Sequence, residues 1–112
     1  MASEPLVPTE KQEAIYQAIG DELIALTPET WHAARLDVAV ESYAGGAEGM
    51  PHTIASLEGH REPIMPSDEL TDLTFRLLAL FREYGRGWKR LRFEVIVQPD
   101  GNWRYQCEFE YS

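Results

Sequence analysis

The sequence predicts an α+β fold, a two-layer sandwich in which two helices cover one face of an antiparallel sheet of four or five strands. Residues 10–26 and 68–84 carry apolar side chains at helical spacing. Residues 34–41, 52–57 and 88–112 alternate apolar and polar side chains, which is typical of half-buried strands. The order along the chain is α-β-β-(β)-α-β-β, and residues 1–112 are expected to form a single domain.

The last 25 residues, Trp88 to Ser112, predict a β-hairpin. Two alternating runs flank Pro99-Asp100-Gly101, the turn chemistry of a type I turn with Gly in the left-handed conformation. If Gln98 faces Asn102, a slip of one residue would put apolar side chains opposite charges, so the register is fixed. The expected pairs are Val97–Trp103, Val95–Tyr105, Phe93–Cys107, Leu91–Phe109, Arg92–Glu108 and Arg90–Glu110. The residues expected in the core are Leu91, Phe93, Val95, Trp103, Tyr105 and Phe109.

The first helix follows a loose, proline-containing lead-in at residues 1–8. Thr9 followed by Gln12 matches a capping box, and the apolar stripe then continues to Leu26. Thr27-Pro28 ends the helix, and we expect Trp31 to fold back over that end. The stripe consists of Ile15, Ile19, Leu23 and Leu26.

The central strands are less sharply defined. Residues 34–41 alternate, and Gly45, Gly46 and Gly49 then mark a turn before a weaker strand at residues 52–57. Residues 58–65 are a candidate for a short third strand, restricted by Pro63 and Pro66 to an edge or a loop.

Ser67 is expected to cap the second helix, which runs from about Asp68 to Tyr84. Acidic residues at positions 68, 69 and 72 suit the positive end of its dipole. The glycines at positions 85 and 87 end the helix, and the hairpin follows. The side chains expected on its buried face are Leu70, Leu73, Leu77, Leu80, Phe81 and Tyr84.

Composition favours a packed cytoplasmic protein. The chain is 44% hydrophobic, and its single cysteine, Cys107, permits no internal disulfide. Cys107 falls on the apolar face of the last strand, where a buried thiol is the ordinary interpretation and a reactive thiol the alternative. The first residues lack the pattern of a secretory signal, and no apolar run is long enough to span a bilayer. We therefore expect a reduced, cytoplasmic compartment and no membrane association.

The net charge of −9 is concentrated in one part of the chain. Residues 1–84 carry 15 acidic and 5 basic side chains, whereas residues 85–112 carry 4 acidic and 5 basic ones. Such a surface repels nucleic acid and attracts basic partners. Solubility alone is an equally weighted explanation of the charge.

The sequence contains no recognisable catalytic motif. His32, His52 and His60 match no zinc spacing, even together with Cys107, and the serines lack a nucleophile elbow. Gly85-Arg86-Gly87 is better explained as a helix stop than as a phosphate-binding loop. We expect no enzyme activity, no catalytic or metal-binding residues and no cofactor.

The chain resembles the YezG-like immunity family, small proteins encoded beside polymorphic toxins. The segments that carry the resemblance are IYQAIGDELIALTPETW (residues 15–31), LDVAVES after it, the amphipathic second helix, and GWKRLRFEVIVQPDGNWRYQCEFEY (residues 87–111). The matching motifs are Pro28-Glu29-Thr30-Trp31, Trp88, Asp100-Gly101 and Phe109-Glu110-Tyr111. Residues 43–66 depart from the pattern, because the family's second strand is rich in Tyr and Phe and this one is not.

The resemblance implies an immunity protein that binds a cognate bacterial toxin and neutralises it, with a nuclease as the favoured class of toxin. An acidic inhibitor suits the basic groove in which a nuclease holds phosphates. The second hypothesis is a non-enzymatic homodimeric adaptor or small-ligand-binding module, and an enzyme is the third. Homo-oligomerisation, and whether the toxin is blocked directly or remotely, stay open.

The candidate partner-binding residues are acids with no evident structural partner, together with one aromatic anchor. Two of the acids belong to the uncovered face of the first strand, and the other candidates belong to the neighbouring loops and weak strands, where a Gly-rich loop offers adaptability. The residues are Asp37, Glu41, Tyr43, Glu48, Glu58 and Glu62.

Overall fold

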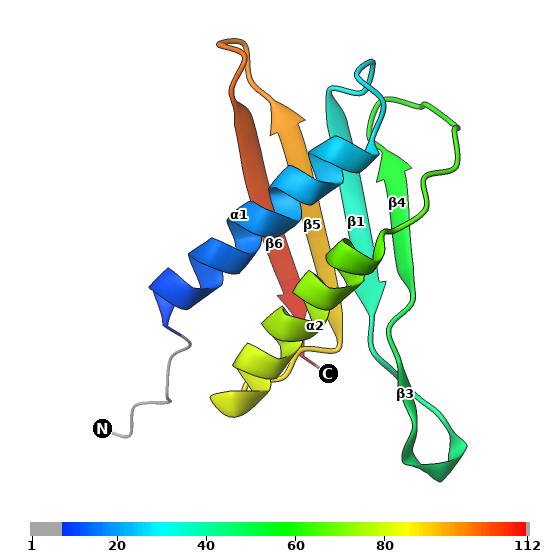
Figure 1. Ribbon diagram of the computed structural model, residues 1–112, viewed down its shortest axis with the longest axis vertical. Helices are drawn as coiled ribbons and strands as arrows, with labels where there is room; N and C mark the ends of the chain where they lie inside the picture. Colours follow the sequence, from blue (N-terminus) through cyan, green and yellow to red (C-terminus); the bar gives the residue numbers. More distant parts are fainter. Residues whose placement is uncertain (1–7, 112) are drawn as a thin grey trace.

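The computed structural model describes residues 8–111, so the expected loose lead-in lies outside the described residues apart from Pro8. Two helices, α1 (Thr9–Leu26) and α2 (Asp68–Glu83), lie on one face of a four-stranded antiparallel sheet (Figure 1). The strands follow the order β4 (His52–Ser56), β1 (Ala33–Ala39), β5 (Arg90–Val97) and β6 (Trp103–Glu110). The predicted α+β sandwich is confirmed, with four strands in its main sheet.

The hairpin β5–β6 has the predicted register at every pair, from Val97–Trp103 to Arg90–Glu110. The Gln98 N–H donates to the Asn102 carbonyl over 2.7 Å, and Gly101 adopts a φ of 88° in the turn, where a side chain would be strained. On β5 the expected core residues Leu91, Phe93 and Val95 are fully buried.

The β6 side chains expected in the core are only partly buried. Trp103, Tyr105 and Phe109 pack against the core but stay half-buried. The reason is the position of β6, which pairs with β5 on one side only and forms an edge of the sheet.

Both helices have almost the predicted bounds, but only one has the predicted cap. The Ser67 Oγ accepts from the Leu70 N–H over 3.0 Å, as expected for α2. The capping box at Thr9 is wrong, because Thr9 is already helical and the residue before the helix is Pro8, whose carbonyl accepts from the Gln12 N–H. The α1 stripe is confirmed at its centre, where Ile19 and Leu23 are fully buried, and Trp31 is buried beyond the end of the helix.

The first predicted strand divides into two. β1 ends at Ala39, and the chain then leaves the sheet as a small ribbon of β2 (Glu41–Ser42) and β3 (Glu48–Gly49). The short 3₁₀ turn η1 (Ala44–Gly46) joins these strands, with both of its glycines at a φ of 85°. The ribbon extends beyond the end of the sheet at which β1 ends and β4 begins (Figure 1). Glu41 therefore lies outside the main sheet, not on its uncovered face as expected.

The candidate third strand in residues 58–65 is reduced to a single antiparallel bridge between Ile54 and Ile64. The rest of the segment is a loop that runs from β4 to α2 (Figure 1). The proline at position 63, next to the bridge, cannot donate to a ladder, so the pairing does not extend.

Candidate functional site

The six predicted partner-binding residues lie in three separate places. Glu41, Tyr43 and Glu48 belong to the β2–β3 ribbon and the turn within it. Glu58 and Glu62 belong to the loop at the opposite end of the sheet, and Asp37 lies on β1. The structure therefore does not bring the six together into one surface.

The premise that these acids lack structural partners is also wrong. Asp37 lies between two arginines, 3.0 Å from the Arg35 Nε and 3.3 Å from the Arg92 Nε. Arg92 faces Glu108 in the register as expected, but it forms an ion pair with Asp37 on the neighbouring strand. Asp37 thus belongs to the charge balance of the sheet.

The β2–β3 ribbon presents Tyr43 to solvent. Its side chain is 53% exposed, and its hydroxyl donates to the Glu41 carboxylate over 2.8 Å. That hydrogen bond raises the pKa of Tyr43 above its ordinary value. The ring lies over Gly49, where a Cβ would meet it at 2.6 Å, so a larger residue at this position would displace the ring. Tyr43 is an aromatic side chain in an exposed position, and its role as an anchor for a partner stays a prediction.

Glu48 fastens the base of the ribbon to α2. Its two carboxylate oxygens accept from the Arg82 guanidinium over 3.0 and 2.8 Å. This two-point hydrogen bond holds the pKa of Glu48 below its ordinary value. Glu48 consequently has a structural role in addition to any contact with a partner.

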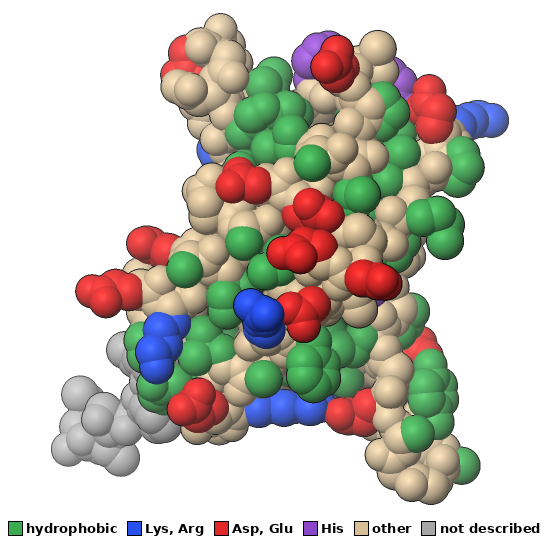
Figure 2. Space-filling model, viewed as in Figure 1, with side chains coloured by type: hydrophobic (Ala, Val, Ile, Leu, Met, Phe, Trp, Pro, Cys, Tyr) green, Lys and Arg blue, Asp and Glu red, His purple; other side chains and the backbone are tan. Residues whose placement is uncertain are grey.

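A groove of about 470 Å³ lies between the base of the ribbon and α2. Phe75 of α2 is the large apolar side chain on its wall and is 55% exposed, and carboxylates stand on its rim. Acidic side chains also gather over the middle of the helix-covered face (Figure 2). The lining residues are Glu48, Met50, Asp68, Thr71, Asp72, Phe75 and Leu78.

Sequence reasoning missed this groove. It favoured a helix-dipole role for Asp68 and Asp72, and it did not consider Phe75. The signal was present, because Phe75 falls outside the buried stripe of Leu70, Leu73, Leu77 and Phe81. A phenyl ring on the polar side of an amphipathic helix is a reason to look for a contact.

His52 contacts the backbone of Met50, which lines the groove, and connects β4 to α2. Its Nε2 is 2.7 Å from the hydroxyl oxygen of Thr74, which is fully buried, and its Nδ1 is 2.5 Å from the Met50 carbonyl. Burial lowers the pKa of His52, so the neutral ring is favoured near neutral pH. The contacts of His52 fasten the groove wall to the sheet.

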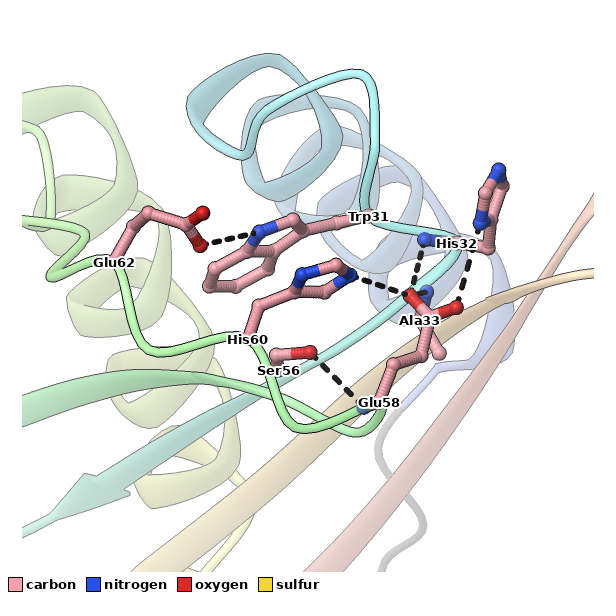
Figure 3. Close-up of polar contacts among 7 residues, drawn as sticks. All are labelled: Trp31, His32, Ala33, Ser56, Glu58, His60 and Glu62. Carbon is pink, nitrogen blue, oxygen red and sulfur yellow. Dashed lines mark hydrogen bonds and ion pairs between the residues drawn. The ribbon is translucent and has the colours of Figure 1, made fainter.

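A polar cluster at the opposite end of the sheet contains the remaining predicted acids (Figure 3). The Glu58 carboxylate accepts from the backbone N–H groups of His32 and Ala33 over 2.6 and 3.2 Å, so it caps the start of β1. These hydrogen bonds lower the pKa of Glu58, and the bond from the His32 backbone N–H makes the largest contribution. The His32 and His60 rings lie 3.3 and 3.7 Å from the same carboxylate.

Trp31 forms the inner side of this cluster. Its indole N–H donates to Glu62 over 3.1 Å, and its ring stacks on His60 with 5.5 Å between centroids and 8° between planes. Glu58 and Glu62 thus hold the loop after β4 against the start of β1, which is a structural role that the sequence did not reveal.

Cys107 is half-buried opposite Phe93 on β5. Burial raises the pKa of its thiol to about 12, with a smaller contribution from the Glu108 charge. Since the thiolate is the reactive form, this environment favours the inert thiol over the reactive alternative.

Residues 8–111 contain no group of three or more His, Cys, Asp or Glu side chains placed to hold a metal ion. In the same part of the chain, no helix is long and apolar enough to cross a membrane.

Comparison of the chain with protein-family models found no match, and comparison with curated proteins found no significant one. The resemblance to the YezG-like immunity family therefore rests on the motifs in the sequence itself.

Proposed function

We propose that this chain is an immunity protein that binds and neutralises a cognate bacterial toxin of basic charge, with a nuclease as the favoured class. The observation that carries the proposal is the acidic helix-covered face (Figure 2), together with Tyr43 in the turn between β2 and β3, whose side chain is 53% exposed. Charge of one sign speeds the encounter with an oppositely charged partner, and exposed aromatic side chains are common anchors in interfaces. The sequence motifs support the same class of function.

The acidic face suits a nuclease for a physical reason. A nuclease needs cationic side chains where the phosphates of its substrate bind, and carboxylates can occupy the same positions. A toxin that attacks another substrate could be bound in the same way if its surface is basic. The charge therefore supports a basic partner, and the nuclease class rests on the family resemblance.

The experiment is co-expression with the toxin domain encoded by the neighbouring gene. We expect cells that express this domain alone to stop growing, and cells that also express the present chain to grow. The two proteins should co-purify as a complex. A chain that is folded and abundant but restores no growth would refute the proposal.

A parallel assay addresses the toxin class. We expect the purified toxin domain to cleave DNA or RNA, and the chain to suppress this cleavage at equimolar concentration. If the chain instead suppressed a different activity of the toxin domain, the toxin would belong to another class, but the proposal that the chain neutralises it would still hold.

A small-ligand-binding module is the second candidate. The groove supports it, because a volume of about 470 Å³ lies within the range of ligand sites. The carboxylates on its rim would restrict such a ligand to a cation with an apolar body. This candidate predicts binding of small cationic molecules without any toxin, which calorimetry would detect.

A further inference from the structure

The exposed ring of Phe75 is the starting point for a more specific statement about the groove. The apolar side chains of the α2 stripe are buried, whereas Phe75, which lies outside the stripe, is 55% exposed on the groove wall. Met50, which is partly exposed, provides further apolar surface beside it, and the buried Leu78 also lines the groove. An apolar side chain from outside that packed here would remove Phe75 and Met50 from water, and such removal stabilises a complex.

The groove is held in shape by contacts that exist before any partner arrives. The Arg82–Glu48 ion pair connects α2 to the ribbon, and the contact between His52 and Thr74 connects β4 to α2. A groove preformed in this way costs little ordering on binding, which favours affinity.

The rim of the groove selects for positive charge. Asp72 is paired with Arg76 over 2.8 Å, and Glu48 is paired with Arg82. Asp68 has no ion pair within residues 8–111, and Glu69 is exposed beside it. An ammonium or guanidinium group near Asp68 would therefore meet a carboxylate that no cationic side chain of the described residues pairs with, at the edge of an apolar surface.

We infer that the groove binds a segment of the toxin in which one large apolar side chain inserts beside Phe75 and an adjacent Lys or Arg reaches Asp68. This inference rests on the proposed function and adds the chemistry of the partner's contacting segment. The apolar side chain supplies the affinity of the contact, and the cation supplies its specificity and salt dependence. Nucleic acid and anionic lipid carry the wrong charge for this rim.

A probe peptide tests the groove without the toxin. The probe is a synthetic peptide with a central pair of Leu residues flanked by Lys, and its control is the same peptide with Glu in place of Lys. We expect the Lys peptide to shift backbone amide resonances of the groove residues, with an affinity that falls as salt is added. The Glu peptide should cause no shifts.

Two pairs of variants separate the apolar contribution from the charge. F75A should weaken binding of the probe by about tenfold or more, whereas M65A, which truncates a 77% exposed side chain in the loop, should not change it. D68N combined with D72N should weaken binding and flatten its salt dependence. The matched control combines E13Q with E29Q and removes the same charge from exposed carboxylates on α1 and in the turn after it.

Several outcomes would overturn the inference. One is unchanged affinity in F75A, and another is amide shifts spread evenly over the acidic surface. If F75A also protects cells from the toxin as well as the wild type does, the groove is not the contact, although the chain is an immunity protein. If the probe binds in the groove but the wild type protects no cells, the groove does bind apolar, cationic segments, and the proposed function is refuted.

Discussion

Glu48 of β3 and Arg82 of α2, 34 positions apart, form a two-point ion pair that fastens the ribbon to the helix layer. Both side chains are 43% exposed, so water and salt weaken the pair. It therefore contributes little to global stability, and its main effect is local order. The ion pair also holds Glu48 in place, although the sequence showed no structural partner for this acid.

Replacement of Glu48 by Gln tests this division between local and global effects. We expect the free energy of unfolding to change by less than about 1 kcal/mol, because exposed pairs contribute little. Amide hydrogen exchange in residues 41–49 should become faster, while exchange in β5 should not change. R82Q should give the same pattern, and the double variant should add nothing further. Loss of global stability well above 1 kcal/mol would contradict this interpretation.

Phe93 tests the core of the sheet. It is fully buried and contacts the rings of Tyr16 and Tyr105, with centroids 6.3 and 5.9 Å away. Phe93→Ala should lower the free energy of unfolding by about 3–5 kcal/mol, because it removes a buried ring and leaves a cavity. The matched control is F75A, where the same truncation at a half-exposed ring should cost less than about 1 kcal/mol. Urea unfolding measures both, and a loss below about 1 kcal/mol for Phe93→Ala would mean that the hairpin face is assigned wrongly.

Cys107 should be nearly inert in the folded protein. Burial raises the pKa of its thiol to about 12, so very little thiolate exists at pH 8. We expect a disulfide reagent to label the folded chain far more slowly than the chain in urea. Equal labelling rates in the two states would show that the thiol is accessible and reactive.

His52 should make stability depend on pH. Burial lowers its pKa in the folded state below the ordinary 6.5. As the pH falls through that value, the unfolded chain takes up a proton at His52 that the folded chain does not, so stability decreases until the folded pKa is reached. Urea unfolding between pH 7.5 and 5.5 should show a loss in the wild type that is smaller in H52Q. Equal losses in both proteins would assign the effect to other groups.

The fold was predictable from the sequence largely because alternation and turn chemistry agree. In the hairpin, Gly101 fixes the turn and the opposed charges fix the register, so every pair is as expected. Ser67 identifies the start of α2 for the same reason, since a hydroxyl before a helix satisfies an unpaired N–H. Local signals with a single physical solution were sufficient for these elements.

Other features depend on contacts that no local pattern encodes. The alternation in residues 34–41 does not reveal that the chain leaves the sheet after Ala39. Burial on β6 depends on its edge position, which follows from strand order.

The acidic candidates show even more clearly that local sequence patterns do not encode long-range contacts. Asp37, Glu58 and Glu62 find their partners across 55, 26 and 31 positions of sequence, so their roles appear only in three dimensions. Three of the six candidates, Glu41, Tyr43 and Glu48, do share one feature, the ribbon. The groove beside it was hidden because Met50 and Phe75 meet only after folding.

The most direct test of toxin neutralisation through an acidic surface is the association rate of the purified chain with the toxin domain encoded by the neighbouring gene, measured at two salt concentrations. We expect rapid association at low salt and a rate that falls several-fold when salt shortens the range of the electrostatic attraction. Neutralisation of Asp68 and Asp72, the α2 carboxylates that line the groove, should slow association and reduce this salt dependence. Absence of any complex at micromolar concentrations would contradict the proposed function. An association rate that does not change with salt would contradict its electrostatic basis.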